Sequence, residues 1–276
     1  MIDNKTPLPT TAAVRIMGIL NTTPDSFSDG GRHFSEQAAL EQAEAMIAAG
    51  ADIIDIGGES TRPYAEPVTI EEELRRVIPV IREIRKNHLT LISIDTTKAA
   101  VAREALAAGA DIINDISALR KDKEMLALVK TTTAPVIIMH MQGTPETMQI
   151  KPQYDNVVEE ILEFFRERIS WVESKGVNRN RLIIDPGIGF GKTREHNLTI
   201  LKHLDRFTEL GLPVLLGHSR KRFLGDITGL DATHRDLPTA VVSALMAACG
   251  VAIIRVHDVV STRQALLVAD AIRNAP

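Results

Sequence analysis

The feature that most constrains the fold is a repeated unit: the end of a helix, a glycine, an apolar strand and then a polar residue. Residues 48–54 read Ala-Ala-Gly-Ala-Asp-Ile-Ile and recur identically at 107–113, and a looser copy occupies 247–254. The polar residues that follow the three copies are Asp55, Asn114 and Arg255. This order is the βα unit of proteins with parallel sheets. The sequence therefore predicts an α/β fold whose strands end in polar side chains.

Eight such units run along the chain. Apolar runs predict strands near 14–20, 52–57, 90–95, 111–116, 135–140, 181–185, 213–217 and 252–257. Amphipathic stretches predict helices near 35–49, 70–86, 98–108, 122–131, 154–175, 195–210, 236–249 and 259–273. The count favours a single-domain (β/α)8 TIM barrel over a doubly wound open sheet, which shows the same alternation. We assign residues 13–276 to the barrel and residues 1–12 to a flexible N-terminal arm.

Residues at the expected helix ends agree with this assignment. Ser35 is the expected N-cap of the first helix. Five glycines stand after helical stretches, where left-handed C-caps are expected: Gly50, Gly109, Gly176, Gly211 and Gly250.

Composition argues against several other classes of protein. The chain has 276 residues and a formal charge of −4, so it lacks the basic excess of a nucleic-acid-binding surface. A single cysteine, Cys249, rules out an internal disulfide and fits a reducing cytoplasm. Segment 237–254 is uncharged and long enough to span a membrane, but Pro238 and Gly250 interrupt it. We expect a buried helix and then a strand there, with no membrane partner and no signal peptide.

Polar residues gather where the predicted strands end. They are Asn21, Thr61, Arg62, Asp95, Asn114, His140, Gln142, Asp185, Ser219, Lys221, Arg255 and His257. In a TIM barrel these ends form the active-site face, so the side chains should meet at one mouth. The loop at 21–34 is longer than the roughly 2–6 residues usual for such a turn, which is typical of functional loops.

Eight blocks of this chain resemble the signatures of the dihydropteroate synthases. They occur in one order at 17–31, 55–63, 93–96, 113–116, 139–143, 185–192, 219–221 and 255–258. The resemblance implies a transferase of folate biosynthesis with two small-molecule substrates, 6-hydroxymethyl-7,8-dihydropterin diphosphate and 4-aminobenzoate, which releases diphosphate. It also implies a homodimer. Segment 240–248 is apolar on nearly every face and is the expected interface.

One group of strand-end residues suits the edge and faces of a pterin ring. Carboxylates, an amide and a cation can pair with ring N–H groups and the ring carbonyl, and Met139 and Phe190 can cover the faces. The resemblance implies a substrate site formed by Phe27, Thr61, Pro63, Asp95, Asn114, Ile116, Met139, Asp185, Phe190, Gly217, Lys221, Arg255, Val256 and His257.

A second group suits an anion: Asn21, Thr61, Arg62, Arg255 and His257. The amide oxygen of Asn21 is a suitable ligand for Mg²⁺ when phosphate oxygens and water supply the others. The resemblance implies that Asn21 binds this metal, while Arg255 and His257 contact the diphosphate.

The resemblance also implies a reaction in which diphosphate leaves first, before the amine of 4-aminobenzoate attacks a ring-stabilised pterin cation. Catalytic roles fall to Asp29, Arg62, Asp95, Lys221, Arg255 and His257. Asp95 is the expected electrostatic partner of the cation. Loops 21–34 and 59–68 are expected to close over the site and exclude water, with Phe27, Pro63 and Lys221 around the aminobenzoate and Asp29 paired with Arg62.

Two residues depart from the family pattern. Tyr64 replaces a glycine and Arg222 replaces a serine, both beside the expected aminobenzoate pocket, so sulfonamide sensitivity does not follow from the resemblance. Two alternative functions stay open. A methyltetrahydrofolate-binding methyltransferase domain would need only the pterin group of residues. A non-catalytic pterin-binding protein should lack Asn21, Arg255 or His257, and all three are present.

Overall fold

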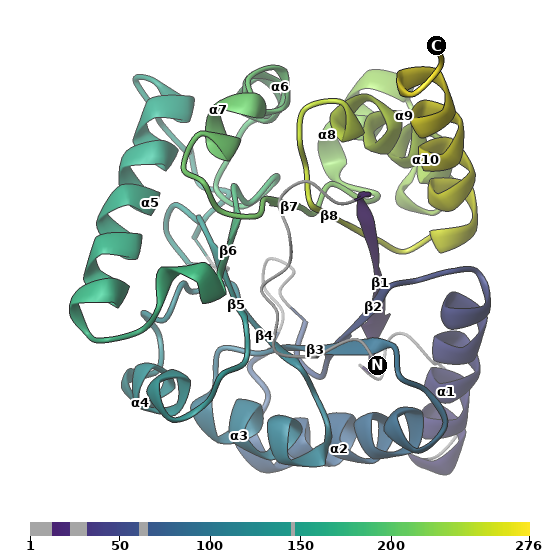
Figure 1. The fold of residues 1–276 in the computed structure, drawn as a ribbon, viewed down its shortest axis with the longest axis vertical. Helices are drawn as coiled ribbons and strands as arrows, with labels where there is room; N and C mark the ends of the chain where they lie inside the picture. Colours follow the sequence, from purple (N-terminus) through teal and green to yellow (C-terminus); the bar gives the residue numbers. More distant parts are fainter. Residues whose placement is uncertain (1–12, 23–31, 61–65, 145–146) are drawn as a thin grey trace.

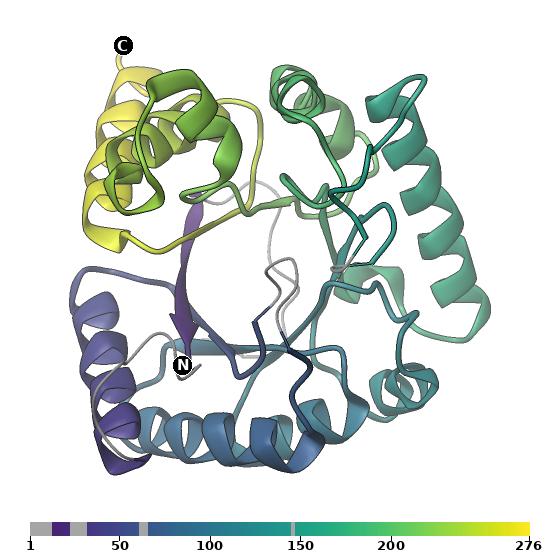
Figure 2. The same cartoon turned by 180° about the vertical axis from the view of Figure 1, so that it is seen from behind.

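A computed structural model of the chain describes residues 13–22, 32–60, 66–144 and 147–276. Within them, eight parallel strands form one nearly closed barrel, with the helices packed around its outside (Figure 1 and, from behind, Figure 2). The strands are β1 (Arg15–Asn21), β2 (Ile53–Gly57), β3 (Leu91–Asp95), β4 (Ile112–Asp115), β5 (Val136–Met139), β6 (Leu182–Asp185), β7 (Leu215–Leu216) and β8 (Ile253–Val256). The predicted (β/α)8 barrel is confirmed.

The helices follow the strands in alternation. They are α1 (Arg32–Ala48), α2 (Ile70–Asn87), α3 (Ala99–Ala108), α4 (Lys123–Thr131), α5 (Val157–Ser174), α6 (Arg194–Lys202), α7 (Asp205–Thr208), α8 (Arg222–Thr228), α9 (Asp236–Ala247) and α10 (Val259–Arg273), with short 3-10 turns at Arg179–Arg181 and Ala232–His234. The predicted helix at 195–210 is two helices, α6 and α7. Helix α8 was not predicted, because seven residues are too few to show helical periodicity.

Helix boundaries show which local signals were strong. All five predicted glycine caps have positive φ, from 70° at Gly211 to 117° at Gly109, as left-handed caps require. Ser35 was predicted to begin the first helix, and this was wrong, since α1 already begins at Arg32. An N-cap preference of about 1 kcal/mol does not set the boundary where no proline or glycine stops the helix.

The strands pair least at the junction of β6 and β7. The strands pair in the order β6-β5-β4-β3-β2-β1-β8-β7, and every pair is parallel. Between the two ends of this order lies a single bridge, Ile184 to Val214, with the Ile184 N–H donating to the Pro213 carbonyl at 3.0 Å. We refer to this junction as the β6–β7 seam.

Side chains alternate in direction along each strand, and those that point into the barrel form the floor beneath the strand-end residues. One apolar residue from each strand contributes to a cluster inside the barrel. Met17, Ile53, Ile112, Ile137, Ile183, Leu215 and Ile253 are buried there, and the partly buried Leu91 packs against them. Residues two positions later face the same side of a strand. These are Ile19, Asp55, Ser93, Asn114, Met139, Asp185, Gly217 and Arg255. One step along the strands therefore changes the barrel interior from wholly apolar to largely polar.

Helix α9 has two contrasting faces. Thr239, Ala240 and Ser243 are buried against the barrel, whereas Leu237 and Leu245 are 73% and 61% exposed. The expectation of a helix followed by a strand in segment 237–254 is confirmed, but the helix is buried on one face only. No helix in the described ranges combines the length and apolar character needed to cross a membrane.

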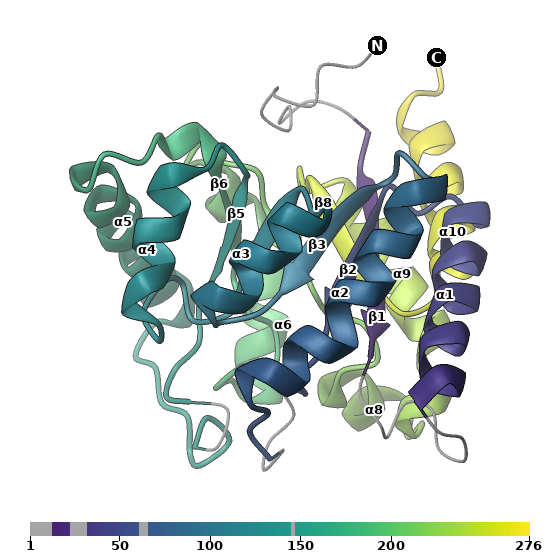
Figure 3. The same ribbon diagram turned by 90° about the horizontal axis from the view of Figure 1, so that it is seen from below.

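Figure 3 shows that β1 runs away from the side where the C-terminus lies and toward the side where α8 lies.

Candidate active site

A charged network lies at the centre of the barrel, where β2, β3, β4 and β8 end. The Arg255 guanidinium donates from Nε to Asp55 Oδ2 at 2.6 Å and from Nη2 to Asp95 Oδ2 at 2.7 Å. Asn114 Nδ2 donates to the same Asp55 oxygen at 3.1 Å. One cation thus bridges two carboxylates, and the fully buried Asp55 also receives an amide donor.

Asp55 was absent from the predicted site, yet the sequence contained the signal for it. Asp55, Asn114 and Arg255 follow the three copies of the internal repeat, and the structure brings these three residues into direct contact. Equivalent positions of a βα repeat lie at equivalent heights on their strands, so the repeat could have identified Asp55 as a member of the site.

The network changes the protonation of its members. Burial raises the pKa of Asp95 to about 7, opposed by the Arg255 cation and reinforced by the Asp55 carboxylate. Burial alone would lower the pKa of Arg255, but the Asp55 and Asp95 carboxylates outweigh it and raise that pKa, so the guanidinium stays charged. Asp95 is therefore a carboxylate that can gain or lose its charge near neutral pH, beside a permanent cation.

A second cluster spans the β6–β7 seam. Asp185 Oδ1 accepts the Gly187 N–H at 2.7 Å, and burial raises the pKa of this carboxyl against the opposing Lys221 charge. A Cβ on Gly217 would lie 3.8 Å from Asp185 Oδ2 and 4.0 Å from Arg255 Cδ. The glycine therefore leaves space beside the second carboxylate oxygen.

Lys221 lies across the seam from Asp185. Its Nζ donates to the Ile188 carbonyl and lies 4.4 Å from the centre of the Phe190 ring. Burial lowers the pKa of Lys221 to about 8, with Asp185 opposing this shift. The amine thus keeps its charge at neutral pH and loses it in mildly alkaline solution.

Apolar side chains border the polar groups. Ile116, Met139, Met141 and Met148 form a buried cluster against which Phe190 packs. Three of the predicted substrate residues, Ile116, Met139 and Phe190, are therefore in one place. The predicted Val256 side chain is not with them. It is fully buried in the core between sheet and helices, because it alternates with Arg255 along β8.

His257 and Asn21 complete the described part of the mouth. Ser219 Oγ lies 2.9 Å from His257 Nδ1 and also accepts the His257 backbone N–H at 3.1 Å, so Ser219 orients the ring. Asn21 is the last residue of β1 and is partly buried. The other predicted site residues, Phe27, Asp29, Thr61, Arg62 and Pro63, lie outside the described residues, as does Tyr64. Arg222 is described, and 89% of its side chain is exposed.

His140 does not belong to the mouth, although its place at a strand end predicted it there. Its ring packs edge-on against Phe164 at 4.9 Å, and Nδ1 lies 3.0 Å from Lys192 Nζ. Because Met139 faces the barrel interior, the next residue faces outward. Burial, together with the Lys192 and Arg120 charges, lowers the pKa of His140 to about 2, so it cannot serve as a proton carrier at neutral pH.

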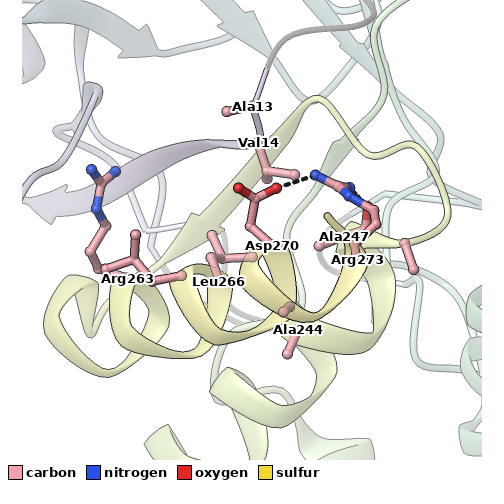
Figure 4. A pocket seen from close by; sticks show the side chains of 11 residues that line it. Ala13, Val14, Ala244, Ala247, Arg263, Leu266, Asp270 and Arg273 are labelled. Carbon is pink, nitrogen blue, oxygen red and sulfur yellow. Dashed lines mark hydrogen bonds and ion pairs between the residues drawn. The ribbon is translucent and has the colours of Figure 1, made fainter. Parts of the chain in front are cut away.

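A surface pocket lies at the other end of the barrel, where α9 and α10 flank the residues that precede β1 (Figure 4). Its wall is mostly alanine and leucine, with Arg263 and the Asp270–Arg273 ion pair beside them. It contains none of the strand-end residues. The polar mouth, not this pocket, is the candidate active site.

Comparison with known proteins gives one consistent result. A family model described as a pterin binding enzyme matches residues 17–257. A dihydropteroate synthase from Synechocystis sp. is 48% identical over 258 residues, which cover 93% of this chain and 89% of that protein.

Solved structures agree with this. Xanthomonas albilineans dihydropteroate synthase with 4-aminobenzoic acid has a TM-score of 0.90 and 46% identity, covering 96% of this chain and 94% of that chain. The same enzyme in complex with 7,8-dihydropteroate gives 0.88 and 44%, covering 98% and 97%. The similarity thus extends over nearly the whole length of the chain.

Proposed function

This chain belongs to the dihydropteroate synthase family, and on that basis we propose how its strand-end residues divide the work of the reaction. It is a transferase that condenses 6-hydroxymethyl-7,8-dihydropterin diphosphate with 4-aminobenzoate, giving 7,8-dihydropteroate and diphosphate in folate biosynthesis. The observation that carries the proposal is the pair of polar clusters, one around Arg255 and one across the β6–β7 seam, on the carboxyl ends of the strands.

The seam cluster recognises the pterin. Asp185 uses one oxygen for the Gly187 N–H, and the other faces the space beside Gly217, where it can accept N–H groups of the ring. Lys221 can donate to the ring carbonyl and an adjacent nitrogen. Met139 and Phe190 supply apolar surface for the flat faces. Asn114, whose NH₂ group donates to Asp55, has its amide oxygen as a further acceptor.

The Arg255 cluster serves the leaving group and the cation that remains. Arg255 uses two of its five N–H donors for Asp55 and Asp95, and the others can contact diphosphate together with His257. As diphosphate departs, positive charge develops on the pterin, and the Asp95 carboxylate stabilises it. Water exclusion by the loops at 21–34 and 59–68 would protect that cation.

Mg²⁺ fits this site as a partner of the diphosphate. Asn21 places one amide oxygen at the end of β1, and no group of three or more acidic, histidine or cysteine residues within the described ranges could hold a metal alone. A single protein oxygen combined with phosphate oxygens and water is an arrangement that Mg²⁺ accepts. When bound, the ion would neutralise developing charge on the leaving group.

The metal role makes a direct prediction. Asn21→Ala should weaken diphosphate binding in the presence of Mg²⁺ and leave binding in the presence of EDTA unchanged, because only the metal-dependent part is removed. Titration calorimetry with diphosphate, with and without Mg²⁺, measures both quantities. Equal Mg²⁺ dependence in the variant and the original chain would exclude Asn21 as a ligand.

The exposed faces of α9 and α10 support a homodimer. Leu237, Val241 and Leu245 on α9 lie one turn apart, and each is more than half exposed. On α10 the exposed apolar residues are Val260, Leu267, Val268 and Ile272. A monomer rarely exposes so many large apolar side chains on two neighbouring helices, so a second copy of the chain is the proposed partner that covers them.

The single cysteine supports a location in the reducing cytoplasm.

One assay tests the reaction. The chain should release diphosphate over repeated turnovers only when Mg²⁺, the pterin diphosphate and 4-aminobenzoate are all present. A methyltetrahydrofolate-binding methyltransferase domain would transfer a methyl group and release no diphosphate, and a non-catalytic protein would bind the pterin without releasing diphosphate. Either result would overturn the assignment.

A further inference from the structure

Arg220 occupies an unusual backbone conformation between two residues of the site. Its φ is 57°, in the left-handed region, although it is not glycine. This conformation costs about 1–2 kcal/mol for an ordinary L-residue and persists only where surrounding contacts impose it. Its neighbours are Ser219, which orients His257, and Lys221, which lies over Phe190.

Four contacts hold Arg220 in place, and all come from the start of α9 or the residue before it. The guanidinium makes a two-pronged pair with Asp236, from Nε to Oδ1 at 2.6 Å and from Nη2 to Oδ2 at 2.7 Å. The Arg220 N–H donates to Thr239 Oγ1 at 3.1 Å, and its carbonyl accepts from Arg235 Nη1 at 3.1 Å. Side chain, N–H and carbonyl are thus all fixed.

The same stripe of α9 also holds the residue before Ser219. His218 is fully buried, with Nε2 3.0 Å from the Thr239 carbonyl and 3.1 Å from Ser243 Oγ. Asp236, Thr239 and Ser243 are three and four residues apart, so they share one face of the helix. This face is the one opposite the exposed Leu237 and Leu245.

We propose that Asp236 is a positioning residue for the reaction, acting through Arg220. By holding Arg220 in the left-handed conformation, it makes the chain turn between Ser219 and Lys221, so that one side chain reaches His257 and the other reaches the seam cluster. This inference rests on the proposed function, because Lys221 and His257 are substrate-contacting residues there. Among the described residues, the hydrogen bonds of the Asp236 carboxylate go to Arg220.

A double-mutant cycle tests this inference. Asp236→Asn should raise the KM for the pterin substrate and lower kcat/KM about 5- to 30-fold, the equivalent of 1–2 kcal/mol of unsupported strain. Arg220→Gly should retain more activity than Arg220→Ala, because glycine adopts this φ without the penalty. In the Arg220→Gly background, Asp236→Asn should change kcat/KM less than about twofold, since no strained residue remains to be held.

The matched control is Glu159→Gln. It breaks another ion pair between two elements, Arg206 to Glu159 at 2.8 Å, which involves no residue of either strand-end cluster, and should leave kcat/KM unchanged. If Asp236→Asn lowers kcat/KM equally in the original chain and in the Arg220→Gly background, Asp236 acts independently of Arg220 and the proposal is overturned.

Urea unfolding separates this proposal from the proposed function. The same cycle, read as unfolding midpoints without any substrate, should show Arg220→Ala below Arg220→Gly and a loss of the Asp236 effect in the glycine background. If the original chain releases no diphosphate, the proposed function is wrong. The unfolding midpoints of the four variants still decide whether Asp236 supports the turn. Additive midpoints would overturn that support.

Discussion

Arg255 combines two tasks in one side chain, because it neutralises the buried carboxylates of Asp55 and Asp95 and faces the expected leaving group. Arg255→Met should therefore lower the free energy of unfolding by about 3–5 kcal/mol, the usual result when a buried ion pair loses one partner. Urea denaturation measures this. A loss below about 1 kcal/mol would show that the carboxylates do not depend on Arg255.

Asp185 should affect binding of the pterin, whereas Arg255 should affect binding of diphosphate. Asp185→Asn should weaken binding of a pterin without diphosphate about ten- to a hundredfold, as expected for the loss of about 1.5–3 kcal/mol from a charge-assisted hydrogen bond. Binding of diphosphate alone should persist in this variant and weaken in Arg255→Met. Calorimetry with each ligand checks both. If the two variants lose both ligands equally while still folded, the site has no separate pterin and diphosphate regions.

Asp95 and Lys221 should set the pH range of activity. The Asp95 carboxyl, with a pKa of about 7, loses its negative charge as the pH falls below that value, and stabilisation of the cation is lost with it. The Lys221 ammonium, with a pKa of about 8, loses its proton as the pH rises. The plot of kcat/KM against pH should be bell-shaped and highest between about 7 and 8.

Lys221→Arg provides the control for that profile. Arginine stays protonated throughout, so the decline above about pH 8 should vanish while the decline below about pH 7 remains. An alkaline decline that persists in Lys221→Arg would assign it to another group.

The sequence predicted most of the described site because the strand ends of a barrel converge. Seven of the predicted residues are at the strand ends that form the mouth: Asn21, Asp95, Asn114, Asp185, Lys221, Arg255 and His257. The errors have one physical cause, the alternation of side chains along a strand. His140 and Val256 sit one position out of phase with inward-facing neighbours, so they face the helices. The strained Arg220 could not be foreseen, since it depends on contacts from α9.

The junction of β2, α2 and α3 contains a second, largely buried ion network. Lys98 Nζ lies 2.5 Å from Glu73 Oε2 and 3.0 Å from Glu59 Oε2. Glu73 is fully buried, and Glu59 Oε1 accepts the Val68 N–H at 2.9 Å. This network therefore ties the two flanks of the segment 59–68 to α2 and α3.

Lys98→Met should leave the Glu73 carboxylate buried without a partner cation. The expected loss in the free energy of unfolding is about 3–5 kcal/mol. Glu73→Gln in the Lys98→Met background should recover part of it, because the uncompensated charge is gone. Thermal and urea unfolding of the two variants provide the measurement. Equal stability of both would mean that charge burial is not the cause.

Element boundaries were less predictable than element types. Long amphipathic patterns gave α2, α5 and α10 nearly to their ends, whereas the run at 213–217 shortens to the two paired residues of β7. The apolar run extends beyond the two paired residues, so it does not by itself mark where pairing ends. Local sequence does not record where a neighbouring strand diverges.

For the whole molecule, the exposed faces of α9 and α10 predict the assembly. The chain should have the mass of a dimer in light scattering at micromolar concentration. Leu245→Glu should give a monomer, because a charge would be buried in the apolar interface. Leu89→Glu, at a residue that is 92% exposed beyond α2, is the control and should stay dimeric. A monomeric original chain would refute the interface.

The barrel itself was predictable because eight βα units leave few topologies open. The sequence pattern could not show how evenly the barrel closes. That depends on the length of β7, and this is where the molecule differs from an ideal closed barrel.

The β6–β7 seam gives the substrate a mechanical role. Asp185 ends β6 and Lys221 follows β7, so a pterin bound by both would link the two strands that the sheet joins by one bridge. The bound ligand would thus connect β6 and β7 where few backbone hydrogen bonds do so. Amide hydrogens of 182–185 and 214–216 should then exchange with solvent more slowly in the complex, and the whole barrel should unfold at higher temperature. Between turnovers, β6 and β7 would separate transiently at the seam, and each newly bound pterin would hold them together again.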